Sequence, residues 1–166
     1  MGFDETVKVH YLDASALVKL VADDADEEPG RAVLRQYYFG HAQHYATSYC
    51  LAEALSAFKV KWLRKMISQD DYVRDVRDFF RVVVSGLAVD EVPLSVQVQN
   101  EAERLMKTYG IDFIDSIQVV TVLRGRFAGL VGGSQSLFIT ADRTLAAVAR
   151  QEGTRVWECT TEATPS

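Results

Sequence analysis

The stretch "VKVHYLDASALVKL", residues 7–20, sets a pattern that the rest of the chain repeats. Its first half is short, β-branched and aromatic, which predicts a strand ending at Asp13. The apolar spacing of the second half predicts a helix that starts directly afterwards. Residues 137–153, "LFITADRTLAAVARQEG", have the same order of a strand, an aspartate (Asp142) and a helix. Strands that lead straight into helices indicate an α/β fold.

The other segments alternate in the same way. Further strands are predicted at residues 44–48, 87–93 and 154–159. Helices are predicted at residues 31–40, 49–66, 70–86, 94–110 and 111–123. Because helices separate nearly every strand, we expect a mostly parallel sheet of four or five strands between two helical layers. One domain is expected over residues 1–158, followed by a disordered tail over residues 159–166.

The composition is that of a soluble globular protein, with 48% hydrophobic and 25% charged residues in a chain of 166. Its two cysteines lack metal-ligand spacing and suit a reducing compartment, so we expect a cytoplasmic protein. No stretch approaches the roughly 20 apolar residues of a membrane helix, and we expect no membrane partner. A net charge of −5 is not typical of proteins that hold nucleic acid through many phosphate contacts. A nucleic-acid partner would therefore need a local basic patch or bound metal ions.

Four acidic residues are predicted to lie near one edge of the sheet. Asp13 and Asp142 end parallel strands, while Glu53 and Asp115 lie in the first turns of two helices. Taken singly, each has an ordinary explanation as a helix cap or as an acid favoured by the helix dipole. Four carboxylates together repel one another unless a cation neutralises them. A cluster with only oxygen donors favours Mg²⁺ or Mn²⁺ over zinc.

A second aspartate precedes one of these acids in "YGIDFIDSIQV", residues 109–119. Asp112 stands where the helix needs an N-cap, and Asp115 is then its third residue. We therefore predict one cap and one metal ligand rather than a catalytic pair.

Four blocks of the chain, read in order, resemble a known family. The blocks are "YLDASALVKL", "TSYCLAEALSAF", "YGIDFIDSIQVVTVL" and "LFITADRTLAAVAR". They are similar to the successive motifs of PIN domains, above all of VapC-type toxins, over about residues 7–158. The resemblance implies a PIN-like α/β/α fold, metal-dependent endoribonuclease activity and a place in a type II toxin–antitoxin pair. It also implies a homodimer inhibited by a small antitoxin protein.

The resemblance also implies roles for particular residues. Asp13 and Asp115 would contact Mg²⁺ or Mn²⁺ directly, and Glu53 and Asp142 would complete the catalytic cluster. Ser15 and Thr140 would orient the acids by hydrogen bonds. The chain departs from the family in the third block, where Ser116 and Ile117 replace a common Ala-Leu pair.

The segment "KVKWLRK", residues 59–65, is locally basic. Its side chains could contact RNA phosphates, or could simply suit the carboxyl end of a helix. The residues concerned are Lys59, Lys61, Arg64 and Lys65. Trp62 continues an apolar stripe, so we expect it to pack within the protein rather than on a base.

The three histidines are not expected to bind metal. His41 and His44 lie in a short connection without a third ligand nearby, and we expect both on the surface. His10 lies within a predicted strand and is expected in the core or at the sheet edge.

Two other functions stay open. A PIN-fold protein could bind RNA or protein without toxin activity. A phosphatase of the haloacid-dehalogenase type would also use carboxylates and Mg²⁺, but needs Asp-x-Asp after its first strand. Here Asp13 is followed by Ala14 and Ser15, which argues against that enzyme.

Overall fold

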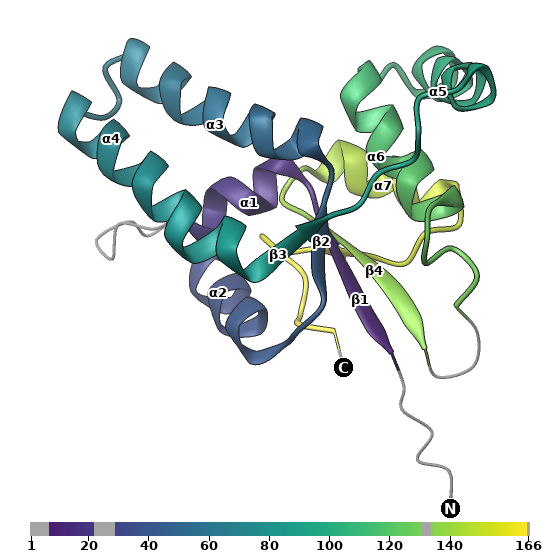
Figure 1. Ribbon diagram of the computed structural model, residues 1–166, viewed down its shortest axis with the longest axis horizontal. Helices are drawn as coiled ribbons and strands as arrows, with labels where there is room; N and C mark the ends of the chain where they lie inside the picture. The colour runs from purple at the N-terminus through teal and green to yellow at the C-terminus, as the bar shows by residue number, and fades with distance from the viewer. Residues whose placement is uncertain (1–6, 22–28, 131–133, 166) are drawn as a thin grey trace, which may run out of the picture.

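The computed structural model describes residues 7–21, 29–130 and 134–165, and a five-stranded sheet forms their centre. The strands are β1 (Lys8–Leu12), β2 (His44–Ala46), β3 (Leu87–Val89), β4 (Gln135–Thr140) and β5 (Val156–Glu158). All neighbouring strands pair in parallel, in the order β3-β2-β1-β4-β5 (Figure 1). The first strand of the chain therefore lies in the middle of the sheet.

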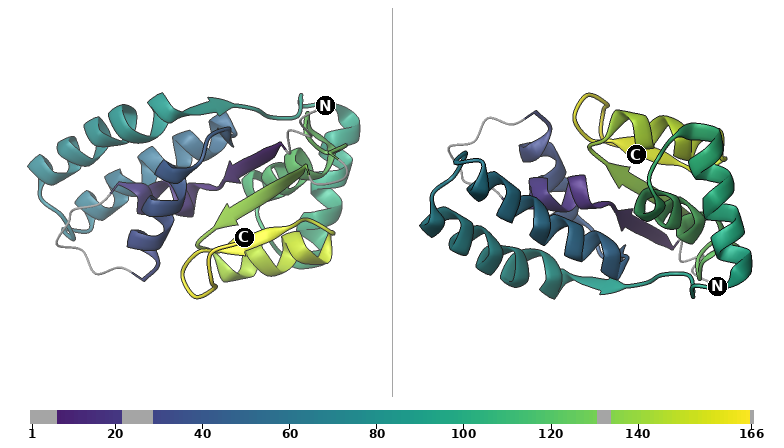
Figure 2. Two further views of the ribbon diagram at one scale, coloured as in Figure 1. Left: turned by 90° about the horizontal axis from the view of Figure 1, so that it is seen from below. Right: turned by 90° about the horizontal axis from the view of Figure 1, so that it is seen from above.

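Helices cover both faces of this sheet. The described helices are α1 (Ala14–Leu20), α2 (Arg31–Gly40), α3 (Ser48–Leu63), α4 (Gln69–Asp78), α5 (Val96–Tyr109), α6 (Phe113–Arg124) and α7 (Arg143–Gln151). After α4 the chain continues through a π-helical turn, η1 (Phe79–Val83), and a 3-10 turn, η2 (Val84–Gly86). Figures 1 and 2 show α1 to α4 on one side of the sheet and α5 to α7 on the other. The predicted three-layer α/β/α fold with a parallel sheet is confirmed.

Side chains of β1 alternate between two separate hydrophobic cores, one on each face of the sheet. Leu12 points into the first core, between the sheet and the layer of α1 to α3. Val9 and Tyr11 point into the second, with α5, α6 and α7. Successive residues of a strand face opposite sides, so one central strand anchors both helical layers.

Helix α6 is the most enclosed helix of the second layer. All of residues 116–122 are buried, as expected for a helix that is apolar on every side. It packs against α5 on one side and contributes to the core beneath the sheet on the other. Even so, no helix in the described residues is long and apolar enough to cross a membrane.

The three histidines gather between β1, β2 and the end of α2, and we call them the histidine cluster (His10, His41 and His44). The ring of His10 lies 5.1 Å from that of His44 and 5.3 Å from that of His41, measured between centroids. His44 is buried and stacks on Tyr38, so the surface position predicted for it is wrong. The reason is register: His44 pairs with His10 across the sheet, which places its ring beneath α2. His41 is exposed and His10 is buried, as predicted.

Helices α3 and α4 form a hairpin that carries the basic segment near its tip (Figure 1). Trp62 stacks on Tyr72 of α4, with ring planes 8° apart and centroids 5.2 Å apart. Trp62 thus packs on a neighbouring helix, but it is half-buried and belongs to neither hydrophobic core, so the core position predicted from the apolar stripe is wrong.

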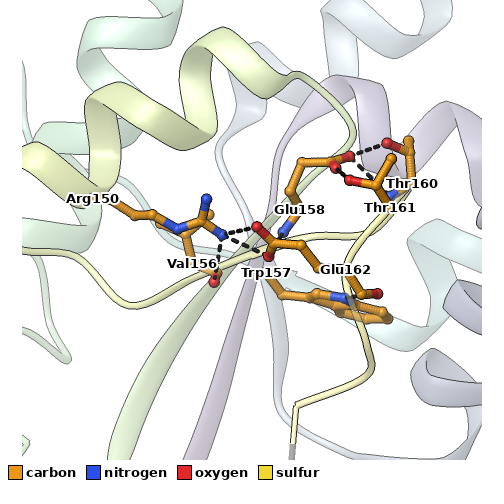
Figure 3. A network of polar contacts seen from close by, with 7 residues as sticks. All are labelled: Arg150, Val156, Trp157, Glu158, Thr160, Thr161 and Glu162. Carbon is orange, nitrogen blue, oxygen red and sulfur yellow. Dashed lines mark hydrogen bonds and ion pairs between the residues drawn. The ribbon is translucent and has the colours of Figure 1, made fainter.

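The segment after β5 was predicted to be a disordered tail, yet the described residues 159–165 include a folded turn. Arg150 of α7 holds the Glu162 carboxylate, which in turn accepts the Glu158 N–H at 3.0 Å (Figure 3). The Glu158 carboxylate accepts the Thr160 N–H and the hydroxyls of Thr160 and Thr161. These side chains satisfy polar groups of the edge strand β5, which explains the order of this segment.

Gly30, at the start of α2, allows this turn to pack closely. Its φ is +79°, and a Cβ at this position would lie 2.0 Å from the Cys159 carbonyl oxygen. Only glycine fits both the backbone conformation and the close approach.

Candidate functional site

The four predicted carboxylates come from four elements that meet at the carboxyl edge of the sheet. Asp13 follows β1 and Asp142 follows β4, and these two strands are paired neighbours. Glu53 comes from α3 on one face of the sheet, and Asp115 from the first turn of α6 on the other. We call these four residues the carboxylate cluster.

Asp13 is the most deeply buried member of the carboxylate cluster. Its Oδ1 accepts the Ala16 N–H at 2.9 Å and caps α1. The Ser15 hydroxyl lies 2.9 Å from both carboxylate oxygens, and the Thr140 hydroxyl donates to Oδ2 at 2.8 Å. The ordinary interpretation of Asp13 as a helix cap is therefore correct. Both carboxylate oxygens accept these bonds, but every donor is neutral, so a second role would depend on the negative charge that the ionised carboxylate keeps.

Ser15 and Thr140 link the two strand ends through their hydroxyl groups. Ser15 Oγ accepts the Ala141 N–H, and Thr140 Oγ1 accepts the Asp142 N–H, each at 2.9 Å. Both hydroxyls donate to Asp13. The two residues therefore fix the Asp13 carboxylate in one orientation, which agrees with the orienting role predicted for them.

Asp142 also caps a helix. Its Oδ1 accepts the backbone N–H groups of Thr144 at 2.7 Å and Leu145 at 3.0 Å. Its negative charge contributes to raising the pKa of both Asp13 and Asp115. Asp142 is thus close enough to act electrostatically on the other acids although its own side chain is exposed.

Proton affinity is raised strongly at two of the acids. Burial is the main cause that raises the pKa of Asp13 to about 6, against the opposing effect of its three hydrogen bonds. Burial also raises the pKa of Asp115 to about 7, helped by the charges of Asp112, Asp13, Glu53 and Asp142. The other three members of the carboxylate cluster thus lie within electrostatic reach of Asp115.

Glu53 presents an oxygen that has no hydrogen-bond partner in the described part of the chain. Its Oε2 is inaccessible to solvent and accepts no hydrogen bond. Burial raises the pKa of Glu53, and the charge of Asp112 adds to this effect. A buried carboxylate oxygen without a donor is costly, which makes this atom a natural ligand for a cation.

Asp112 is the N-cap of α6, as predicted, and its Oδ1 accepts the Asp115 N–H at 2.9 Å. Its charge nevertheless raises the pKa of both Glu53 and Asp115. Asp112 was predicted to have a capping role alone, so this electrostatic contribution is an addition. The three-residue spacing to Asp115 was the available signal, since it places both side chains on one helix face.

Two more acids lie next to this edge and were not predicted. Asp90 accepts the Tyr11 hydroxyl, and Glu91 accepts the backbone N–H and the hydroxyl of Ser48 at 2.9 and 2.7 Å. Both follow β3 directly, so their position after a strand was the signal that could have found them. Their hydrogen bonds give them structural roles.

The donors of the carboxylate cluster fit a hard divalent cation, because all of them are carboxylate oxygens. Across the described residues, no lysine or arginine forms an ion pair with any of the four acids. As the side chains stand, no group of three or more His, Cys, Asp or Glu in that part of the chain could hold a metal ion. The four acids therefore interact electrostatically, but their side chains are not arranged as a metal-binding site.

The predicted RNA-contacting residues are not brought to the carboxylate cluster. Arg64 follows α3 and lies eleven residues beyond Glu53, which is about 16 Å along a helix that rises 1.5 Å per residue. Lys61 lies within electrostatic reach of Asp75 on α4. Lys59 and Lys65 are exposed. The basic segment forms a separate surface near the tip of the hairpin.

Comparison with known proteins supports the architecture. The crystal structure of PAE2754 from Pyrobaculum aerophilum matches with a TM-score of 0.59. The two chains are 20% identical, and the match covers 89% of this chain and 88% of the other. No family model matches the chain, and no curated protein matches it. This structural likeness shows a shared fold.

Proposed function

We propose that this protein is a ribonuclease of the VapC type that depends on Mg²⁺ or Mn²⁺ and hydrolyses RNA phosphodiester bonds. One observation carries the proposal: the carboxylate cluster lacks a compensating cation among the described side chains, and an oxygen of Glu53 is buried without a donor. Such an arrangement is costly unless a cation occupies it. The motifs that resemble PIN domains supply the reaction class.

The chain's own residues have distinct tasks in this proposal. Asp13 and Asp115 would hold the cation directly, and Glu53 and Asp142 would complete its surroundings. Ser15 and Thr140 hold Asp13 in place before any ligand arrives, which limits the reorganisation needed on binding. A bound Mg²⁺ or Mn²⁺ would neutralise charge on the phosphate and acidify a water molecule.

The phosphatase alternative is disfavoured by what surrounds Asp13. That chemistry needs a second carboxylate two residues after the first, and Ser15 occupies this position. Its hydroxyl donates to Asp13 instead of serving as an acid.

RNA, a second copy of the chain and a small inhibitory protein are the partners included in the proposal. The basic segment would contact RNA phosphates away from the reaction site. A positively charged side chain of the inhibitor would suit the acidic cluster.

Charge reversal at Lys61 and Arg64 tests the RNA contact. RNA affinity should fall and its dependence on salt should weaken. An unchanged salt dependence would remove this surface from the proposal.

The decisive experiment incubates the protein with structured RNA and, separately, with a generic phosphate monoester. Each reaction is run with Mg²⁺, with Mn²⁺ and with EDTA. We expect RNA cleavage with either cation and none with EDTA. Asp115→Asn should lower the cleavage rate by roughly 10²–10³-fold, because it removes a charge on which the reaction centre depends. Asp78→Asn, at the last residue of α4, is the matched control and should cleave normally.

Each other outcome has a defined meaning. Cleavage that persists in EDTA would contradict the metal requirement. Hydrolysis of the monoester without RNA cleavage would favour a phosphatase, and RNA binding without cleavage would favour a binding module. Expression of the wild type and of Asp13→Ala in a host cell, with RNA ends sequenced, tests the toxin role. Equal growth and equal RNA ends would contradict it.

A further inference from the structure

Gln118 is a buried amide on α6 with no hydrogen-bond partner in the described structure. Its side chain is 2% exposed, and both Oε1 and Nε2 are inaccessible and unbonded. A buried polar group without a partner destabilises the folded state, so native proteins rarely keep one without a reason.

The other buried polar side chains of α6 do have partners. The Ser116 hydroxyl donates to the Asp112 carbonyl oxygen at 2.7 Å. Thr121 Oγ1 accepts the Val92 N–H at 3.3 Å. The first bond lies within the first turn of α6 and the second joins α6 to the segment after β3, whereas the Gln118 amide forms neither kind of bond. The helix is otherwise apolar at this depth, so a leucine or methionine would suit the position better as packing.

The position of Gln118 on the helix relates it to the carboxylate cluster. It follows Asp115 by three residues, which places the two side chains on one face. Side chains of a helix lean toward its N-terminus, so a glutamine side chain at this position can reach toward the turn that carries Asp115. The Asp115 carboxylate accepts no hydrogen bond from the described residues, although it is partly buried. An unused donor and an unused acceptor thus lie one turn apart.

We propose that Gln118 is a positioning residue whose Nε2–H donates to the Asp115 carboxylate when that carboxylate holds a divalent cation. The bond would fix the direction in which Asp115 presents its oxygens, as hydrogen bonds behind metal ligands commonly do. It would also supply the buried amide with its missing partner. This inference rests on the cation requirement of the proposed function, but not on the identity of the substrate.

The test compares Gln118→Leu and Gln118→Met with Thr121→Val, a matched control on the same helix with the same burial. Two properties are measured without RNA: the melting temperature in EDTA, and the affinity for Mn²⁺ from the electron paramagnetic resonance signal of the free ion. Both Gln118 variants should be at least as stable as the wild type in EDTA and should bind Mn²⁺ roughly tenfold more weakly. Thr121→Val should melt at a lower temperature and bind Mn²⁺ normally.

A purely structural role for Gln118 predicts the opposite combination, with lower stability and unchanged Mn²⁺ affinity. That result in both apolar variants would overturn the inference. A wild type that binds no Mn²⁺ would overturn it as well. Normal Mn²⁺ binding without RNA cleavage would contradict the ribonuclease proposal alone, so the two failures are distinguishable.

Discussion

Strand β1 leads to two buried ionisable side chains, His10 and Asp13, whose surroundings differ in one instructive way. Burial lowers the pKa of His10 to about 4 and raises that of Asp13 to about 6, so both are pushed toward the neutral form. His10 has partners on both ring nitrogens, Ala42 and Tyr37, and lies among aromatic rings. Asp13 lies within electrostatic reach of Asp142 and Asp115. His10 is thus satisfied by neutral partners, although the buried Nδ1 of its neighbour His44 has no hydrogen-bond partner in the described residues. The carboxylate cluster differs in that its like charges have no ion-pair partner among the described lysines and arginines.

The largest difference is expected when one ionisable side chain in each cluster, Asp13 or His10, is replaced by a neutral amide. Asp13→Asn should abolish RNA cleavage. Its effect on the stability of the metal-free protein should be small, because the relief of like charges offsets the hydrogen bonds that one of the two oxygens no longer accepts. His10→Gln should retain cleavage but lose about 1–3 kcal/mol of stability with its hydrogen bonds. Cleavage assays and melting curves in EDTA measure both effects. An Asp13→Asn variant that is unstable but still cleaves RNA would contradict this assignment, because Asp13 would then have the structural role expected of His10.

A divalent cation should stabilise the protein through the carboxylate cluster and not through the histidine cluster. At a concentration about 100 times its Kd, Mg²⁺ would stabilise the folded protein by about 2.7 kcal/mol, or roughly 5–10 °C in melting temperature. The same shift should appear in His10→Gln and be largely lost in Asp115→Asn. Melting curves at rising Mg²⁺ concentration test this, and an equal shift in all three proteins would point to a site elsewhere.

The contributions of the carboxylate cluster and of the histidine cluster to stability should also change in opposite directions with pH in the metal-free protein. The raised pKa values of Asp13, Asp115 and Glu53 mean that stability from these groups falls as pH rises from about 4 to 7. Lowered pKa values of His10 and His44 mean that stability from these groups falls as pH drops through the same range.

Matched variants separate these opposing contributions. Relative to the wild type, Asp115→Asn should gain stability most at pH 7, and His44→Gln should lose least near pH 4. Melting temperatures in EDTA between pH 4.5 and 7.5 give both differences. Differences that do not change with pH in either variant would show that neither cluster titrates in this range.

The smallest effect is expected at Asp112. Asp112→Ser keeps an N-cap and removes one charge, so the pKa of Asp115 and Glu53 should fall while RNA cleavage continues. The acidic limb of the pH–rate profile should therefore move to lower pH. Asp115→Ser is the contrasting variant and should be inactive. Loss of activity in both would make Asp112 a member of the carboxylate cluster.

Features that depend on neighbouring residues could be predicted from the sequence. The strand, aspartate and helix order at Asp13 and Asp142 is local, and both residues cap helices as that order implies. Parallel strands bring their carboxyl ends to one edge, so the meeting of these acids followed from the fold class.

Features that depend on distant contacts could not be predicted. The burial of His44 follows from its register with β1, and the order of the last turn depends on an ion pair between Glu162 and Arg150. The lack of a hydrogen-bond partner for Gln118 depends on the elements that pack around α6, and these are distant in sequence. None of these contacts leaves a periodic signal in the sequence.

The central place of β1 has a consequence for the order of assembly during synthesis. Thr140 donates to Asp13 across 127 residues of chain, and β4, which brings Thr140 and Asp142, pairs directly with β1. Strand β1 is made before β4 and must therefore wait for it. Contacts this distant in sequence form late. If the proposed activity is correct, a nascent chain cannot cleave RNA, including the message that encodes it, until β4 has been made and has paired.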